Sequence, residues 1–155
     1  MMEITRELAK FNHIKFHDKE HKYYLNGKQM SSVTKLIGKY KQPFDSDYWS
    51  EKKANERGVL KEDILKEWKY KADFATQKGS AVHAFAENYL FNKVFPFPEQ
   101  EMVEVLGSVE NMFECRAAVK TIIELFKKFY DDSYGKLVPV RAELVVGDEE
   151  LGLCG

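Results

Sequence analysis

The sequence has few cysteines and no long apolar run, and both absences narrow the classes of protein that it can encode. Its two cysteines, Cys115 and Cys154, are too few and too far apart for a disulfide-rich scaffold or a cysteine zinc site, which favours a reducing compartment. No apolar run approaches the length of about 18 residues that marks a transmembrane helix, and no signal peptide opens the chain. We therefore expect a soluble, cytoplasmic protein without a membrane partner.

Internal repeats, low-complexity segments and linkers are also absent, so the 155 residues are expected to form one domain with a substantial core. Neither sign of charge dominates, since the formal net charge is -1. The charge is nevertheless unevenly spread, because residues 1–78 have a net charge of +5 and residues 79–155 have −6. Such an asymmetry is expected of a protein that binds an anionic polymer with its basic part and a metal cation with its acidic part. Charged residues on solvent-exposed helix faces would produce the same distribution of charge.

Strand-like alternation marks the beginning of the chain. Residues 12–17 alternate between polar and apolar side chains, and residues 21–25 return with two tyrosines. The following Asn26-Gly27 predicts a hairpin with a type I′ turn, because both central positions of that turn need a positive φ. Residues 28–30 would then form a third short strand.

The same alternation decides how the histidines of this segment are interpreted. It places His13, Lys15 and His17 on one face of the first strand, opposite to the apolar side chains. His13, His17 and His21 are spaced like metal ligands on a helix. The alternation and the turn before His21 argue against such a zinc site.

Apolar residues at helical spacing predict that most of the remaining chain is helical. The expected helices cover residues 3–10, 31–38, 48–57, 61–75, 79–92, 99–106 and 108–131. The last of them should be capped by Ser108 and form a main wall of the core. Residues 138–146 and 151–153 are expected to form a C-terminal hairpin, which gives an α/β (α+β) fold, rich in helix.

The end of the sequence falls within the second strand of that hairpin. A lone two-stranded hairpin is marginally stable in water, and an unpaired edge strand invites association. We therefore expect either a homo-oligomer formed through this edge or a longer native protein.

The stretch from Lys78 to Glu87 holds the most distinctive pattern of the sequence. Gly79 is placed at the expected start of a helix, where it would leave the N-terminus open to an anion such as phosphate. His83 and Glu87 follow at a spacing of four residues, so both side chains share one helix face and can point at one object. The alternative is an ordinary half-exposed pair on an amphipathic helix.

Short motifs occur in order along the whole chain. They are Tyr23-Tyr24-Leu25-Asn26-Gly27-Lys28, Ser32-Val33-Thr34, Pro43-Phe44-Asp45, Tyr48-Trp49, Gly79-Ser80-x-x-His83-x-x-x-Glu87, Pro139-Val140-Arg141-Ala142-Glu143 and Leu151-Gly152-Leu153-Cys154-Gly155. This ordered set resembles phage-type exonucleases of the PD-(D/E)xK superfamily. The motif around His83 is similar to the first motif of their RecB-type branch, G-T-x-x-H-x-x-x-E, with Ser80 in place of threonine. The last two motifs resemble the strand pair that precedes the catalytic aspartate of the family.

The resemblance implies that residues 1–155 form a single nuclease-like domain, the N-terminal part of a restriction-endonuclease-like fold. The family's catalytic Asp and its acidic-x-Lys strand would follow after this part. The resemblance also implies a metal-dependent DNA exonuclease with Mg²⁺ or Mn²⁺ as cofactor, because phosphodiester hydrolysis needs a water nucleophile and neutralisation of charge. His83 would be a metal ligand, and Glu87 a metal ligand or a catalytic group. Glu143 would be a catalytic residue at the edge of the same cleft or, alternatively, an ordinary outward-facing strand residue. Alone, the chain is expected to bind metal weakly and to cut no DNA.

DNA is the partner that the resemblance implies. The residues expected along the DNA path are Trp49, Lys52, Lys53, Arg57, Lys78, Gly79 and Ser80. Trp49 would either wedge against the duplex end or pack beneath it. Two alternatives remain, namely a non-catalytic nucleic-acid-binding module of the same fold and a helical interaction protein with no nucleic-acid role.

Overall fold

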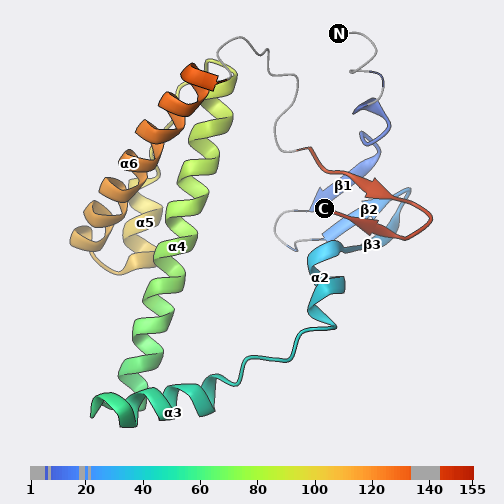
Figure 1. Ribbon diagram of the computed structural model, residues 1–155. Coiled ribbons are helices and arrows are strands. Elements are labelled where there is room, and N and C mark those ends of the chain that lie inside the picture. Colours follow the sequence, from blue (N-terminus) through green and yellow to red (C-terminus); the bar gives the residue numbers. More distant parts are fainter. Residues whose placement is uncertain (1–5, 7, 18–19, 21, 134–143) are drawn as a thin grey trace. The chain divides into compact units, whose positions relative to one another are not determined.

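The computed structural model describes residues 6, 8–17, 20, 22–133 and 144–155. Within these residues it contains five helices and a five-stranded sheet, which confirms the predicted α+β class (Figure 1). The contacts group the chain into two compact units, Met1–Phe44 with Val140–Gly155 and Asp45–Pro139, and each unit is described by itself. The single nuclease-like domain expected from the sequence stays a prediction.

The first unit is built on a sheet to which both ends of the sequence contribute. Its strands are β1 (Ile14–His17), β2 (Lys22–Leu25), β3 (Lys28–Ser32), β4 (Gly147–Asp148) and β5 (Leu153–Cys154). Their order in the sheet is β1-β2-β3-β5-β4, and all neighbours are antiparallel except β3 and β5, which are parallel. The predicted N-terminal meander is therefore confirmed.

The turn between β2 and β3 is the one that the sequence predicts. Asn26 and Gly27 both have a positive φ, at 51° and 80°, which is what a type I′ turn requires. Such a short turn fixes the register of the two strands, and Tyr24 consequently lies opposite Gln29, while Tyr23 lies opposite Met30.

The core of the first unit lies on one face of this sheet. Leu25, Met30 and Cys154 are buried, and Ile14 and Tyr23 pack against them. These side chains belong to four different strands, so one hydrophobic cluster joins the meander to the C-terminal hairpin. α2 (Val33–Gly38) follows β3 directly, and the Ser32 side chain caps it by accepting a hydrogen bond from the backbone N–H of Lys35.

The C-terminal hairpin differs from its prediction in two ways. β5 lies between β3 and β4, and the backbone N–H of Ser31 donates a hydrogen bond to the carbonyl oxygen of Gly152 at 3.0 Å. The expected unpaired edge at the last strand is therefore wrong, because the meander offers β5 a partner. Of the strand expected over 138–146, residues 138–143 lie outside the described residues, and 144–146 are not assigned to a strand.

The described part of the second unit is helical. Its elements are α3 (Ser46–Arg57), α4 (Lys61–Leu90), α5 (Glu99–Leu106) and α6 (Val109–Ser133). Side chains of Asp45 and Ser108 cap α3 and α6 by accepting hydrogen bonds from backbone N–H groups. Gly58 ends α3 in the left-handed conformation, with a φ of 66°. These ends match the predicted ones to within about two residues, as is usual for helix boundaries.

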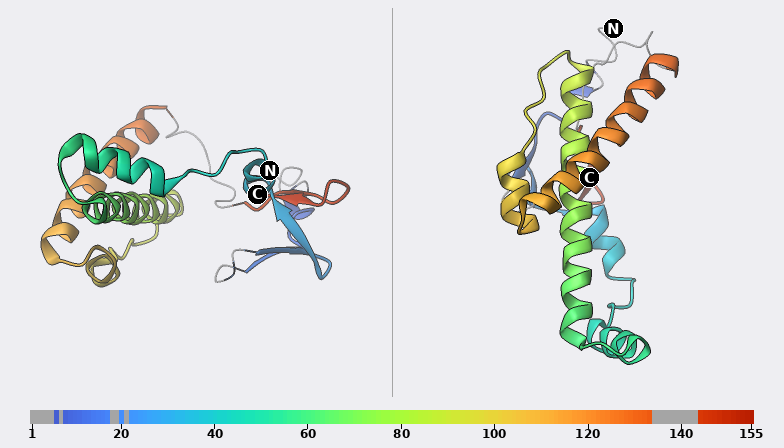
Figure 2. Two further views of the ribbon diagram at one scale, coloured as in Figure 1. Left: turned by 90° about the horizontal axis from the view of Figure 1, so that it is seen from below. Right: turned by 90° about the vertical axis from the view of Figure 1, so that its left-hand side faces the viewer.

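The core of the second unit lies where α4, α5 and α6 meet. α6 crosses α4, and α5 lies beside both of them (Figure 2). The buried residues of this core are Ala81, Met102, Leu106, Met112, Cys115 and Val119. The predicted role of the last helix as a wall of the core is thereby confirmed. None of the helices among the described residues has the length and hydrophobicity needed to span a bilayer.

Candidate functional site

α4 is one continuous helix where the sequence predicted two. It runs from Lys61 to Leu90, so Gly79 lies inside it and not at a helix start. The open N-terminus expected at Gly79 is therefore wrong, and with it the phosphate site that depended on it. The physical reason is that an interior glycine costs a helix only about 1 kcal/mol, which the packing of Ala81 and its neighbours against α5 and α6 offsets.

His83 and Glu87 lie one helical turn apart on α4, and both side chains are exposed. Side chains at this spacing share a face, with Cβ atoms about 5–6 Å apart. Val82, which precedes His83, packs on the core of the unit. The core therefore anchors this turn of α4 while its two polar side chains remain accessible to solvent.

The pair offers two of the ligand types that Mn²⁺ accepts, an imidazole nitrogen and a carboxylate. No cluster of three or more His, Cys, Asp or Glu side chains suited to a metal ion occurs among the described residues. Glu143, the third residue expected at this cleft, lies outside them. A metal held by His83 and Glu87 would therefore complete its coordination with water or phosphate oxygens, as Mg²⁺ commonly does.

Trp49, expected on the DNA path, lies on the outer surface of α3. It is 41% exposed, so the alternative of a buried Trp49 is wrong. The ammonium group of Lys52 lies 5.1 Å from the centroid of the Trp49 ring, within the range of a cation–π contact. Tyr48, which is 55% exposed, meets the same ring edge-on at 5.2 Å. Two aromatic rings and one ammonium group are thus accessible together.

The other two cations expected on α3 form ion pairs. Lys53 lies 2.9 Å from Glu56, and Arg57 lies 2.8 Å from Glu67. Lys53 lowers the pKa of Glu56, while Lys71 and then Arg57 lower the pKa of Glu67. This face of α3 therefore alternates in charge, and it attracts phosphate less strongly than its three cations alone would.

Lys78 and Ser80 do not share one surface on α4. The ammonium group of Lys78 lies 5.9 Å from the ring of Phe74, which packs on the core, and Lys78 itself is half-buried. Its charge acts on the buried thiol of Cys115, whose pKa burial raises and Lys78 lowers by a smaller amount. Ser80 is exposed. The structure thus brings His83 and Glu87 together and leaves Lys78 on the core side of the helix.

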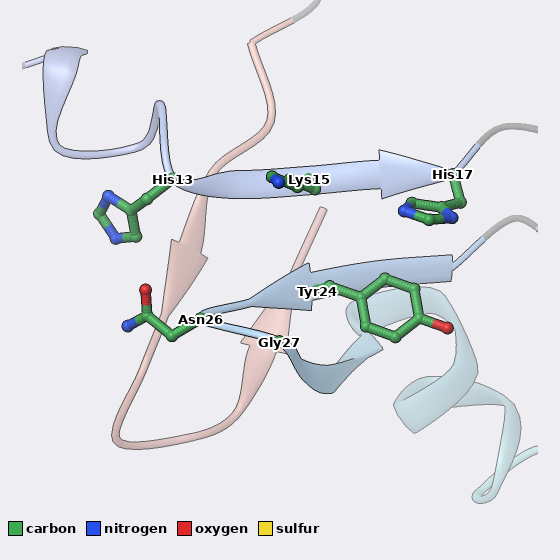
Figure 3. Close-up of a pocket in the computed structure, with 6 residues that line it drawn as sticks. All are labelled: His13, Lys15, His17, Tyr24, Asn26 and Gly27. Atoms are coloured by element: carbon green, nitrogen blue, oxygen red, sulfur yellow. The ribbon is translucent and has the colours of Figure 1, made fainter.

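The sequence did not predict a hollow on the outer face of the β1–β2 hairpin, which is the face opposite to the core of the first unit. The hollow has a volume of about 510 Å³ and is lined by His13, Lys15, His17, Tyr24, Asn26 and Gly27 (Figure 3). The alternation of the first strand predicts that its three polar residues share a face. Tyr24 joins them only through the register of β2, and the register of this pair was not predicted.

Comparison with models of protein families, with curated proteins and with solved structures gave no match. Function is therefore inferred from the side chains of this chain and from their placement.

Proposed function

We propose that this chain belongs to a metal-dependent DNA nuclease and that His83 and Glu87 are its metal ligands. The observation that supports this proposal is the exposure of both side chains, one turn apart, on a helix that the core holds in place. The resemblance of the surrounding motif to that of RecB-type nucleases points the same way. The finer assignment, to the N-terminal part of a restriction-endonuclease-like exonuclease fold, belongs to the same proposal.

The roles of the two residues follow from their chemistry. When bound, Mg²⁺ or Mn²⁺ supplies an activated water and neutralises charge on the phosphate group. His83 contributes a neutral imidazole nitrogen, which is the form that coordinates metals. Glu87 contributes a carboxylate from the next turn of the same helix. Because α4 keeps the two at a fixed separation, little further ordering is needed when they bind one ion.

Metal binding can be tested directly with Mn²⁺, whose paramagnetism broadens the NMR signals of nearby nuclei. We expect small amounts of Mn²⁺ to broaden the ring signals of His83 before those of His13 and His17. Glu87→Gln should abolish this selectivity, because it removes the carboxylate and keeps the shape of the side chain. Equal broadening of all three histidines, or selective broadening of His83 that persists in Glu87→Gln, would contradict the proposal.

Glu124→Gln is the matched control. Glu124 is an exposed carboxylate on α6 that follows Lys120, not a histidine, by four residues, so its loss should leave the broadening of His83 unchanged. In any form of the protein that cuts linear duplex DNA with Mn²⁺, His83→Ala and Glu87→Gln should each lower the cleavage rate by at least about a hundredfold, since both are proposed to hold the metal.

A second candidate function is a nucleic-acid-binding module without catalysis. The exposed pair of Tyr48 and Trp49, with Lys52 beside it, favours this candidate. Aromatic side chains that stack on bases contribute roughly 1–3 kcal/mol per base. Trp49→Ala should then weaken DNA binding by at least about fivefold, as measured by fluorescence anisotropy. Phe113→Ala is the control, because Phe113 is a 57% exposed aromatic residue on α6.

A further inference from the structure

The meander of the first unit has two chemically different faces. Ile14, Tyr23, Leu25 and Met30 gather on the face that holds the core. Side chains alternate along a strand, so their neighbours in sequence belong to the opposite face. That face is polar, and it includes the hollow shown in Figure 3.

The register of the strands determines which side chains of the polar face lie next to one another. Lys15 on β1 lies opposite Tyr24 on β2, and Tyr24 lies opposite Gln29 on β3, so the three form one row across the strands. A second pair, His17 and Lys22, lies beside this row. Lys15, His17 and Gln29 are exposed, and Tyr24 and Lys22 are half-buried.

The hollow is elongated along β1. Figure 3 shows His13 beside Asn26 at one end, His17 beside Tyr24 at the other, and Lys15 between them. The rings of His17 and Tyr24 are 4.9 Å apart, between centroids, and are tilted by 53°. An aromatic pair and a row of nitrogen donors are thus combined on one open surface.

The hollow is lined by one cation, Lys15, and by neutral polar donors. Two histidines, one lysine, one tyrosine, one asparagine and one glycine line the hollow, and this lining contains no carboxylate. The nearby carboxylate of Glu20 is paired with Lys22 at 2.7 Å, and Lys22 lowers the pKa of Glu20. The side chains around Lys15 therefore favour an anion as the occupant.

The spacing of the donors excludes a chelated metal and favours a polymer. His13 lies in the turn before β1, and Figure 3 shows it at the opposite end of the hollow from His17, so the two imidazoles are not placed to share one ion. A single small anion would use Lys15 and one histidine, and would leave the ring of Tyr24 unused. A single-stranded nucleic acid offers both a row of phosphates and exposed base faces, whereas a duplex keeps its bases stacked inside.

We propose that the outer face of the β1–β2 hairpin binds single-stranded nucleic acid. Lys15 and His17 on β1, together with His13 just before it, contact phosphates of the strand, and Tyr24 stacks on a base. Proteins that bind single strands without sequence preference combine these two elements, a cationic track and an aromatic platform. This site does not depend on the metal ligands of α4.

The test is fluorescence anisotropy of a labelled oligothymidine of about 10 nucleotides, which is within the usual range of site sizes. Tyr24→Ala should weaken binding by about fivefold to 150-fold, the equivalent of one stacked base. Tyr24→Phe keeps the ring and should restore binding to within about twofold of the original chain. Equal binding by the original chain and by Tyr24→Ala would overturn the proposal.

Lys15→Glu reverses a charge at an exposed position and is expected to leave the fold intact. It should weaken binding by at least about tenfold and flatten the dependence of affinity on salt. Lys39→Glu is the matched control, since Lys39 is an exposed lysine of the same unit that follows α2, and it should bind within about twofold of the original chain. Equal losses in both variants would show that only net charge matters and would overturn the proposal.

Three further outcomes separate this site from the others. Inorganic phosphate at matched ionic strength should not displace the oligonucleotide, and displacement would reduce the site to one for small anions. Binding of the oligonucleotide should be the same with and without EDTA, so a failure of the metal proposal is not a failure of this one. If Trp49→Ala abolishes binding while Tyr24→Ala does not, the single strand binds α3, and the proposal is wrong.

Discussion

The thiol of Cys154 donates a hydrogen bond to the carbonyl oxygen of Ser31, 3.5 Å away, although 123 positions of the sequence separate them. The two residues belong to the parallel pair of β5 and β3, in which Ser31 faces Leu153 and Ser32 faces Cys154. This pairing is why the Cys154 side chain is only 2% exposed near the end of the sequence.

Alkylation of the cysteines should therefore report on the pairing of β5. Burial raises the pKa of both the Cys154 and the Cys115 thiols, and the thiolate is the form that reacts. We expect iodoacetamide at pH 8 to label both at least about tenfold more slowly in the native protein than in urea, since a protection of about 1.4 kcal/mol is a factor of ten. Mass spectrometry of the labelled peptides measures each rate.

Cys115 serves as the internal control, because it is fully buried in the core of the second unit. Slow labelling of Cys115 with rapid labelling of Cys154 would show that β5 is not held on β3. Slow labelling of both is the outcome that the sheet order predicts.

Gly79→Ala should stabilise the protein. Gly79 is inside α4, its φ is not positive, and a Cβ added there meets no atom within 4 Å outside its own helix. Alanine is favoured over glycine inside a helix by about 0.5–1 kcal/mol, and this gain should appear in the free energy of unfolding from urea titrations followed by circular dichroism.

Gly58→Ala is the contrasting variant. Gly58 also has open space around it, but its φ is 66°, a conformation that side chains rarely adopt. Substitution there should lower the free energy of unfolding by about 1 kcal/mol. A loss of stability in Gly79→Ala similar to that in Gly58→Ala would show that α4 is interrupted at Gly79, as the sequence first predicted.

Met102→Ala should destabilise the second unit by about 2–5 kcal/mol, because it removes a fully buried side chain from the junction of three helices. Val105→Ala, on the same short helix α5 but 42% exposed, should change stability by less than about 0.5 kcal/mol. Thermal unfolding followed by circular dichroism distinguishes the two. Equal effects would place α5 away from the core.

Gly147→Ala should destabilise the first unit. A Cβ at this position would lie 2.7 Å from Cδ1 of Ile14 and 3.1 Å from the carbonyl oxygen of Leu153, so a strand or a side chain must shift, at a cost of about 1–3 kcal/mol. Faster hydrogen exchange of the β3 and β5 amides would measure the loss. Gly38→Ala, which has open space around its Cβ, is the control and should leave this exchange unchanged.

Features set by neighbouring residues could be predicted from the sequence. The type I′ turn at Asn26 and Gly27, the cap at Ser108 and the end of α3 depend on local backbone geometry. The residues at a turn or a helix end largely determine its backbone geometry by themselves, which is why these predictions are confirmed.

Features set by distant contacts could not be predicted in the same way. Gly79 has a weak preference against helix, and packing of α4 on α5 and α6 outweighs it. The partners of β5 depend on β3, far away in the sequence. For the candidate site, the spacing of His83 and Glu87 predicts their shared face. The placement of Tyr24 beside Lys15 depends on strand register, which one strand alone does not determine.

The first unit is interrupted in sequence by the whole of the second, since Asp45–Pro139 lies between its two segments. During synthesis, β1, β2 and β3 therefore leave the ribosome well before β5 exists. The helices of the second unit make mainly local contacts and can form meanwhile, because local contacts form fast. β5 can join β3 only after these helices have been synthesised, and until then the edge of β3 on the nascent chain is open to strands of other proteins.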